Sequence, residues 1–193
     1  MRKILILTQI FLAFVLTDCK KGPDDPKISL LTRKARLCGK WNLSSGTSSL
    51  KVVQNSVAPT NLHIQNMDGT MATVYDDFNW TTYKIPYTLN LEIKKDGTFT
   101  MNENFGGNVL GANGTWEFAG GGKHKNKEKV FFNIESVSKG STGVNLFNKE
   151  CTEFTYEILR LKNKEIVLQA ANDILIKANG DKIKFDGHFT LHQ

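Results

Sequence analysis

From residue 39 onward, apolar and polar residues alternate along the chain in short stretches separated by turn-forming residues. Such alternation is typical of β-strands that bury one face. The clearest example lies at residues 89–94, which are followed by the dipeptide Asp96-Gly97 and a second alternating stretch at residues 98–101. Asp-Gly between two such stretches is typical of a two-residue hairpin turn. The sequence therefore predicts a protein built largely of β-hairpins.

The same pattern recurs along the rest of the chain and predicts about nine or ten short strands with local connections. Sequential hairpins are typical of an antiparallel up-and-down barrel or of a sandwich. The spacing needed for βαβ units is missing, which excludes a parallel nucleotide-binding sheet. Only residues 27–38 favour a short helix, with Ile28, Leu31 and Ala35 on one face. The stretches in which these strands are expected are residues 41–43, 50–53, 89–94, 98–101, 114–118, 130–134, 154–161, 165–170, 174–177, 182–185 and 189–191, some of which would join into one strand.

The N-terminus has the pattern of an export signal. A short cationic start with Arg2 and Lys3 precedes an apolar run at residues 4–16. A helix of this length spans about 20 Å, which is too short for the hydrocarbon core of a bilayer and suits a secretory signal peptide. Residues 16–19 (Leu-Thr-Asp-Cys) resemble a bacterial lipobox, which implies cleavage before Cys19 and lipidation of its thiol. An ordinary signal peptide is the alternative.

Three segments follow from this interpretation: a lipoprotein signal peptide at 1–18, a lipidated tether at 19–26 and one barrel domain at 27–193. The tether is polar and rich in turn-forming residues, as a flexible linker should be. Lys20 directly after the cysteine resembles the outer-membrane class of such lipoproteins. We therefore expect a protein of the cell envelope that is held to the outer membrane by its lipid, with the periplasmic or surface face left open.

Two cysteines remain once Cys19 carries lipid. Cys38 and Cys151 are an even pair in an oxidising compartment and could form a disulfide. Two buried free thiols are the alternative, and the sequence leaves both open. No histidine lies at zinc-finger spacing from either cysteine, so we expect no metal at this pair.

The charge and composition of the chain limit the classes of partner that we expect. The 193 residues carry a formal net charge of +6, and 40% of them are hydrophobic, which fits one globular domain. Only four of the 25 basic residues are arginine, the residue that proteins use most to read bases and grip phosphates, so nucleic acid is not expected as a partner. The chain is expected to be a monomer.

Motifs for catalysis are missing from the sequence. The four histidines form no metal-binding pattern, and the chain has no nucleophile elbow, phosphate-binding loop or redox C-x-x-C motif. We therefore expect neither an enzyme nor a bound cofactor or metal ion.

Four blocks of sequence follow one another along the predicted strands: residues 39–41 (Gly-Lys-Trp), 91–100, 114–116 (Gly-Thr-Trp), and 156–161 with 164–168. Together these blocks resemble the bacterial lipocalin-like domain of Gram-negative lipoproteins. This resemblance implies an eight-stranded antiparallel barrel that is closed at one end and has an apolar interior able to hold a small ligand. A long segment at residues 44–86 departs from the family pattern.

Aromatic residues on the predicted inner face are the candidates for ligand contact. As a set they could line a pocket, whereas each alone is more often ordinary core. Arg160 could pack on one of them, Trp41, although a rim position suits an arginine better. The candidates are Trp41, Phe99, Trp116, Phe118, Phe132, Tyr156 and, less centrally, Phe185.

The sequence supports two functional hypotheses. The first is a non-enzymatic, lipid-anchored barrel that sequesters a small apolar or amphiphilic ligand, with residues 44–86 as a lid over its mouth. The second is an interaction module with a packed core, which contacts a partner protein, a glycan or the envelope through residues 44–86 or the basic loop at 123–129. Filling of the interior by its own aromatic side chains would argue against the first.

Overall fold

A computed structural model of the chain describes residues 31–53, 60–76, 80–119, 128–138, 153–170, 174–176 and 182–193. The signal peptide, the tether with Cys19, Cys151 and most of the basic loop at 123–129 lie outside these ranges. The structure therefore leaves the interpretation of the N-terminus as a prediction. Within the described ranges, no helix is long and apolar enough to cross a membrane.

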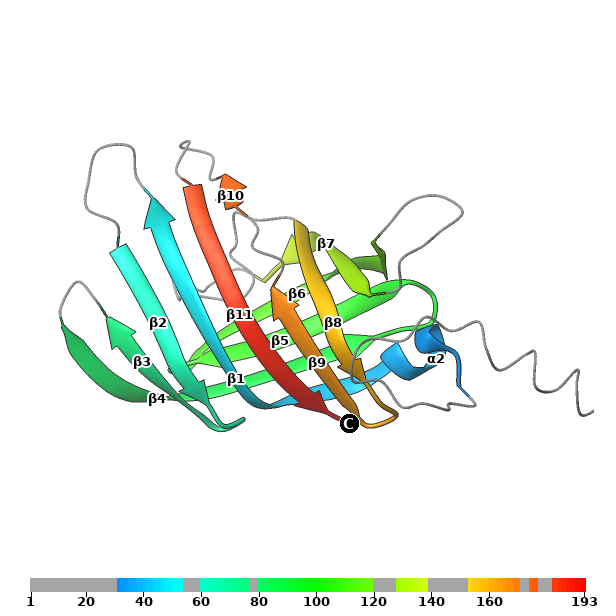
Figure 1. The fold of residues 1–193 in the computed structure, drawn as a ribbon, viewed down its shortest axis with the longest axis horizontal. Helices are drawn as coiled ribbons and strands as arrows, with labels where there is room; N and C mark the ends of the chain where they lie inside the picture. The colour runs from blue at the N-terminus through cyan, green and yellow to red at the C-terminus, as the bar shows by residue number, and fades with distance from the viewer. Residues whose placement is uncertain are drawn as a thin grey trace, which may run out of the picture.

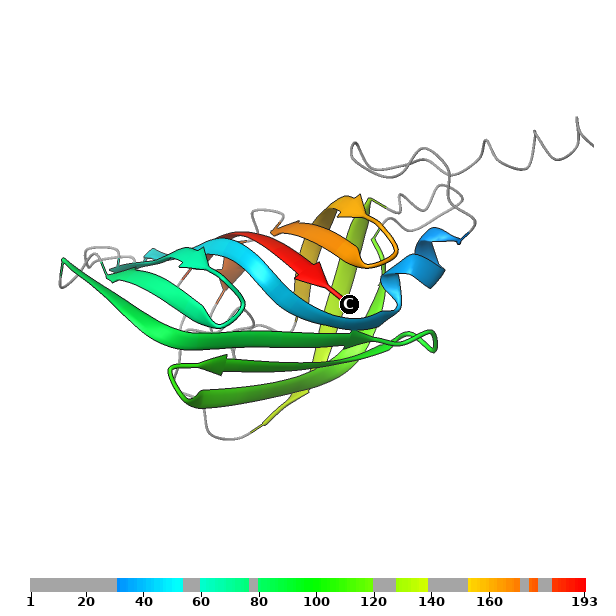
Figure 2. The ribbon, with the colours of Figure 1, turned by 90° about the horizontal axis from the view of Figure 1, so that it is seen from below.

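The described residues form one short helix and an antiparallel sheet that closes on itself (Figures 1 and 2). Closure is made by β11, which pairs with β9 on one side and returns to β1 on the other. This confirms the predicted all-β barrel class. The elements are α2 (Arg33–Leu37), β1 (Gly39–Val53), β2 (Thr60–Met67), β3 (Met71–Asp76), β4 (Thr81–Ile93), β5 (Thr98–Phe105), β6 (Asn108–Phe118), β7 (Lys129–Val137), β8 (Glu153–Leu161), β9 (Glu165–Ala170), β10 (Ile174–Ile176) and β11 (Lys182–His192).

The predicted count of eight strands is wrong, because ten strands close the barrel. The ring runs from β1 through β9 in order and then through β11. Strand β10 is not part of the ring, and it pairs with the first three residues of β11. The first four residues of β1 pair with the end of β4. Beyond them β1 and β4 separate, and the β2–β3 hairpin fills the gap between them (Figure 1).

Residues 44–86 thus build part of the barrel wall, where the sequence suggested a lid. Their described part comprises most of β1, all of β2 and β3, and the first residues of β4. A bulge between Leu43 and Ser45 bends β1 at the point where it leaves β4. The two predicted strands at 41–43 and 50–53 are therefore one long strand, which pairs with β11 up to Val53.

Helix α2 lies across the end of the barrel where β1 begins, and we call this the α2 end. The Thr32 hydroxyl oxygen accepts a hydrogen bond from the Ala35 backbone N–H at 3.1 Å and caps the first turn. Leu37 is fully buried, and the Arg36 guanidinium donates to the carbonyl oxygen of Leu161. The predicted apolar face of this helix is wrong, since Leu31 is 47% exposed while Arg33 and Arg36 are buried. Ile28 lies outside the described residues.

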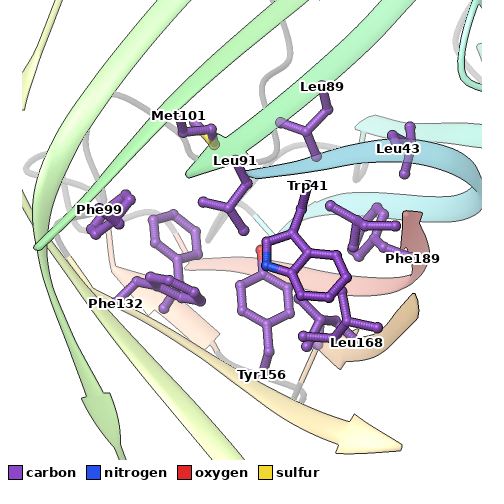
Figure 3. Close-up of a cluster of buried hydrophobic side chains, with 14 of the residues drawn as sticks. Trp41, Leu43, Leu89, Leu91, Phe99, Met101, Phe132, Tyr156, Leu168 and Phe189 are labelled. Atoms are coloured by element: carbon purple, nitrogen blue, oxygen red, sulfur yellow. The ribbon is translucent and has the colours of Figure 1, made fainter. Parts of the chain in front are cut away.

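Alternation along the strands places the hydrophobic core inside the barrel. In β5, every second residue from Phe99 to Phe105 is buried, and β4 and β6 show the same period of two. The predicted hairpin between β4 and β5 is confirmed, but the predicted two-residue turn is wrong, because residues 94–97 connect the strands. Gly97 has φ +93°, and the Asp96 carboxylate accepts from the Thr98 N–H at 2.9 Å. Figure 3 shows side chains from both walls of the barrel meeting in this core.

Candidate functional site

An apolar cavity lies in the middle of the barrel, between the two walls. Its lining comes from six strands and is almost entirely carbon and sulfur. The volume open to the centre of a water-sized sphere is about 20 Å³, which is close to the space of a single water. Pockets for drug-sized ligands are an order of magnitude larger. The lining residues are Leu89, Leu91, Met101, Phe132, Tyr156, Leu168, Phe189 and Leu191.

Aromatic rings fill the barrel on the side of the cavity toward the α2 end. Phe132 packs edge-to-face on Phe99 with ring centres 5.0 Å apart, and on Tyr156 at 6.1 Å. Tyr156 in turn packs edge-to-face on Phe189 at 6.2 Å (Figure 3). Perpendicular contacts of this kind are favourable beyond the area they bury, so this half of the interior is a packed core.

The candidate ligand residues separate into two groups. Phe132 and Tyr156 line the cavity, and Phe99 packs directly behind Phe132. The others are not among the residues that line the cavity. Trp41 belongs to the same buried cluster and donates from Nε1 to the Leu37 carbonyl at 2.9 Å (Figure 3). Ligand contact by any of the six stays a prediction.

The remaining two candidates, Trp116 and Phe118, pack on each other near the α2 end with ring centres 5.7 Å apart. The Trp116 Nε1–H donates to the Lys94 carbonyl at 2.8 Å, and the ammonium of Lys34 lies 5.7 Å from the ring centre. Lys34 is therefore the cation that packs on a tryptophan. Arg160 instead pairs with Glu165 at 2.9 Å and is about one-third exposed, in agreement with a rim position.

The sequence did not point to two candidate functional residues that the structure brings together. These are Tyr87 on β4 and Glu103 on β5. The Tyr87 hydroxyl donates to Glu103 Oε1 at 2.7 Å, and both side chains are at most 1% exposed. Burial of a carboxylate is costly and is seldom found without a specific purpose. The signal was present in the sequence: extending the alternation of β5 four residues beyond Met101 places Glu103 on the inner face, between Met101 and Phe105.

Burial raises the pKa of Tyr87 well above its ordinary value, and the neighbouring Glu103 carboxylate raises it further. The folded protein thus keeps this phenol protonated at a pH where the unfolded chain begins to lose the proton. The contribution of Tyr87 to the free energy of unfolding is therefore fully present below the ordinary tyrosine pKa of about 10. This contribution is lost as the pH rises above that value toward the raised pKa of the folded state.

We therefore expect the urea midpoint of the wild type to fall more steeply between pH 9 and pH 11 than that of Tyr87→Phe. Urea titrations followed by circular dichroism at several pH values would measure this. Tyr83→Phe is the matched control, since Tyr83 lies on the same strand with its side chain 41% exposed. Parallel curves for the wild type and Tyr87→Phe would contradict the expectation.

The interior is more open at the far end of the barrel, opposite α2, where β4 begins and the Gly106–Gly107 turn joins β5 to β6. Tyr83 and Ile85 share the inner face of β4 with Tyr87, yet Tyr83 is 41% exposed and Ile85 is half-buried. Across the barrel, Ser48 of β1 pairs with Gly187 of β11, and both are half-buried. Solvent thus reaches the inner face at this end.

Gly187 makes room at the far end for two aromatic rings. Phe185 and Phe189 stack nearly parallel, 6.4 Å apart, across this glycine. A Cβ at position 187 would lie 2.5 Å from the Phe189 ring, so a larger residue would displace it. The rings of Phe185 and Phe189 form the apolar border between the packed half and the far end.

Cys38 is half-buried next to α2 and forms no disulfide with any residue that the structure describes. Burial raises its pKa, against the opposing effect of the Lys34 and Lys95 ammonium groups. Cys151 lies outside the described residues, so the choice between a disulfide and two free thiols stays open. Among the residues that the structure describes, histidines, cysteines and acids form no cluster that could hold a metal ion.

Comparison with known proteins adds little to this geometry. No family model matches the chain, and no curated protein does either. Among solved structures, the chain is similar to the crystal structure of Rv2717c from M. tuberculosis, with 12% sequence identity over 82% of this chain and 92% of that one. The TM-score is 0.29, which supports no argument about fold or function.

Proposed function

We propose that the protein is a non-enzymatic lipoprotein of the Gram-negative envelope, related to the lipocalin-like lipoproteins, whose barrel binds a small apolar or amphiphilic molecule. The observation that carries the proposal is the inner face of the far end, where apolar and aromatic side chains are partly open to solvent. Tyr83 and Ile85 supply this surface, and the buried Phe185–Phe189 stack borders it on the inner side. The lipid on Cys19 would hold the barrel at the outer membrane.

The size of the central cavity sets where such a ligand can bind. At about 20 Å³ the cavity holds no ligand unless rings move, so binding takes place at the far end, with Phe189 as the ring that turns to extend the site inward. A ligand that removes about 200 Å² of apolar surface from water gains roughly 5 kcal/mol before the entropic costs of binding. This favours a small molecule held with modest affinity.

Native mass spectrometry of the chain beginning at Lys20 tests the proposal. All described elements lie after residue 30, so this chain retains the whole barrel. We expect a reproducible extra mass that disappears on extraction with organic solvent, or uptake of apolar probes by the extracted protein. A bare mass without uptake of any probe would contradict ligand binding.

The small cavity also favours a second function, an interaction module with a packed core. Trp80, just before β4, is 83% exposed, and Tyr83 lies close to it along the chain. Exposed aromatic residues of this kind are common in binding surfaces. A bare mass in the first experiment, together with loss of a partner from Trp80→Ala in pull-downs from envelope fractions, would support the module.

A further inference from the structure

The outer face of the sheet carries a group of uncharged polar side chains on β5, β6 and β7. Strand pairing brings them together, because Asn113 of β6 lies between Thr100 of β5 and Ser136 of β7. We propose that this group, which we call the amide face, binds an uncharged, hydroxyl-rich glycan. The site goes beyond the proposed function, since it lies on the opposite side of the sheet from the barrel interior. The amide face comprises Thr100, Asn102, Asn113, Ser136 and Ser138.

A shallow hollow of about 430 Å³ lies over the amide face. Gly111 forms part of its floor, because a Cβ there would lie 3.4 Å from oxygen atoms of Asn102 and Ser138. A second shallow hollow, of about 380 Å³, follows along the same strands. Sites for small molecules have volumes in this range, and the two hollows together offer an elongated surface for several sugar units. The second hollow is lined by Thr115, Glu117, Phe131, Asn133, Glu153 and part of Trp116.

The residue types of the amide face bring no gain to folding. Asparagine is depleted in β-strands, and its side chain competes with the ladder for backbone hydrogen bonds. Asn102 and Asn113 nevertheless occupy exposed positions inside β5 and β6. The outward positions of β5 are all uncharged, although 23% of the chain is charged. Local choices that oppose the secondary structure are expected at functional sites.

The hydrogen bonds within the amide face leave donors and acceptors for a ligand. Ser136 Oγ donates to Asn113 Oδ1 at 3.0 Å, which holds the amide in one orientation. Among the described residues, none accepts from the amide nitrogen of Asn113, which keeps two N–H donors. Ser138 Oγ accepts from the Gly111 N–H at 2.7 Å and can donate its own proton. Sugar hydroxyls both donate and accept, so a glycan can satisfy all of these groups.

The charges around the two hollows decide between ligand classes. Neither lining includes lysine or arginine, the residues with which proteins bind nucleic acids and anionic lipids. Glu117 and Glu153 would repel an anionic ligand from the second hollow. The C–H face of a sugar ring can pack on the half-buried ring of Phe131, which removes apolar surface from water. An uncharged glycan therefore fits this surface best.

Affinity electrophoresis of the chain beginning at Lys20 tests the proposal. Native gels are run toward the cathode, because the chain is basic, and contain dextran, mixed-linkage β-glucan, galactomannan or arabinoxylan. These uncharged polymers are too large for the barrel interior, so retardation reports binding at the outer surface. We expect at least one of the four to retard the wild type relative to a non-binding protein of similar size. In the double variant Asn102→Ala/Asn113→Ala, the affinity for that polymer should fall at least fivefold.

Two variants serve as controls. Asn66→Ala removes the same side-chain atoms from an exposed position on β2 and should bind as the wild type does. Trp80→Ala should also bind unchanged, and a loss of retardation there would place the site at the exposed tryptophan and overturn the inference. Full affinity in the double variant, or no retardation by any of the four polymers, would overturn it as well.

The double variant is checked for folding by circular dichroism. Should it fail to fold, Asn102→Ala alone takes its place, with an expected loss of affinity of at least twofold. An unchanged affinity in that variant would overturn the inference.

Discussion

Trp41→Ala should lower the free energy of unfolding by about 3–5 kcal/mol, the usual cost of deleting a large aromatic side chain from a core. Trp41 is 1% exposed and lies at the α2 end, where the first residues of β1 pair with β4. Its indole also donates to the Leu37 carbonyl at 2.9 Å. The substitution therefore leaves a cavity and removes a hydrogen bond that holds α2 against the barrel.

Urea titration followed by far-ultraviolet circular dichroism measures this loss without relying on tryptophan fluorescence. Trp80→Ala is the matched control, because the same atoms are removed from a side chain that is 83% exposed. We expect that variant to stay within about 0.5 kcal/mol of the wild type. A Trp41→Ala variant that loses less than about 1 kcal/mol would show that the α2 end is not part of the cooperative core.

Local signals in the sequence were enough for the hairpins. Alternation at a period of two predicted β8 and β9 to within one residue at each end, and it predicted the end of β4 and the start of β5 equally well. Asp96-Gly97 lies in the turn that joins β4 to β5, with Gly97 at positive φ. These features depend on residues that are close in sequence, so a single sequence is sufficient to predict them. The barrel class follows because consecutive hairpins pair in order around the sheet.

The β2–β3 hairpin was missed although Asp68-Gly69 marks its turn, where Gly69 has φ +88° and the Asp68 carboxylate accepts from the Met71 N–H at 2.8 Å. The neighbouring part of β1 has no such local signal. Residues 44–49 are serine, glycine and threonine, without an apolar face to indicate a strand. They are extended in the structure because β11 pairs along one side of β1 and β2 along the other. Pairing with β11, more than 100 positions away, thus helps to decide the conformation of this segment. The strand count rises from eight to ten because β2 and β3 are inserted between β1 and β4.

The sequence predicted which aromatic residues lie inside the barrel, but it did not predict the polar pair that is buried among them. The aromatic residues do gather inside the barrel, as their alternation indicated. Glu103 falls on the inward positions of the β5 alternation, between Met101 and Phe105, but the predicted strand ended at residue 101 and so did not include it. Only the position of Tyr87 across the β4–β5 ladder shows that this acid is buried and hydrogen-bonded.

Gly114→Ala should destabilise the barrel by about 3 kcal/mol or more, although it adds one methyl group. A Cβ at this position would lie 1.9 Å from the Asn133 carbonyl oxygen on β7. That oxygen belongs to the backbone and cannot turn aside, so the two strands must separate. Gly114 also follows a shift in the β6–β7 register, where the strands approach closely. Overpacking at a rigid contact has costs of this order or somewhat less.

Gly111→Ala on the same strand separates this steric effect from the change of residue type. Its Cβ would lie 3.4 Å from the side-chain oxygens of Asn102 and Ser138, which is an ordinary contact that flexible groups can adjust. We expect Gly111→Ala to stay within about 1 kcal/mol of the wild type in the same urea titration. Equal losses for the two variants would mean that both reflect the intrinsic preference of glycine at these sites. A loss confined to Gly114→Ala would place the effect at the close approach of β6 to β7, the ladder that carries the Phe132 wall of the barrel.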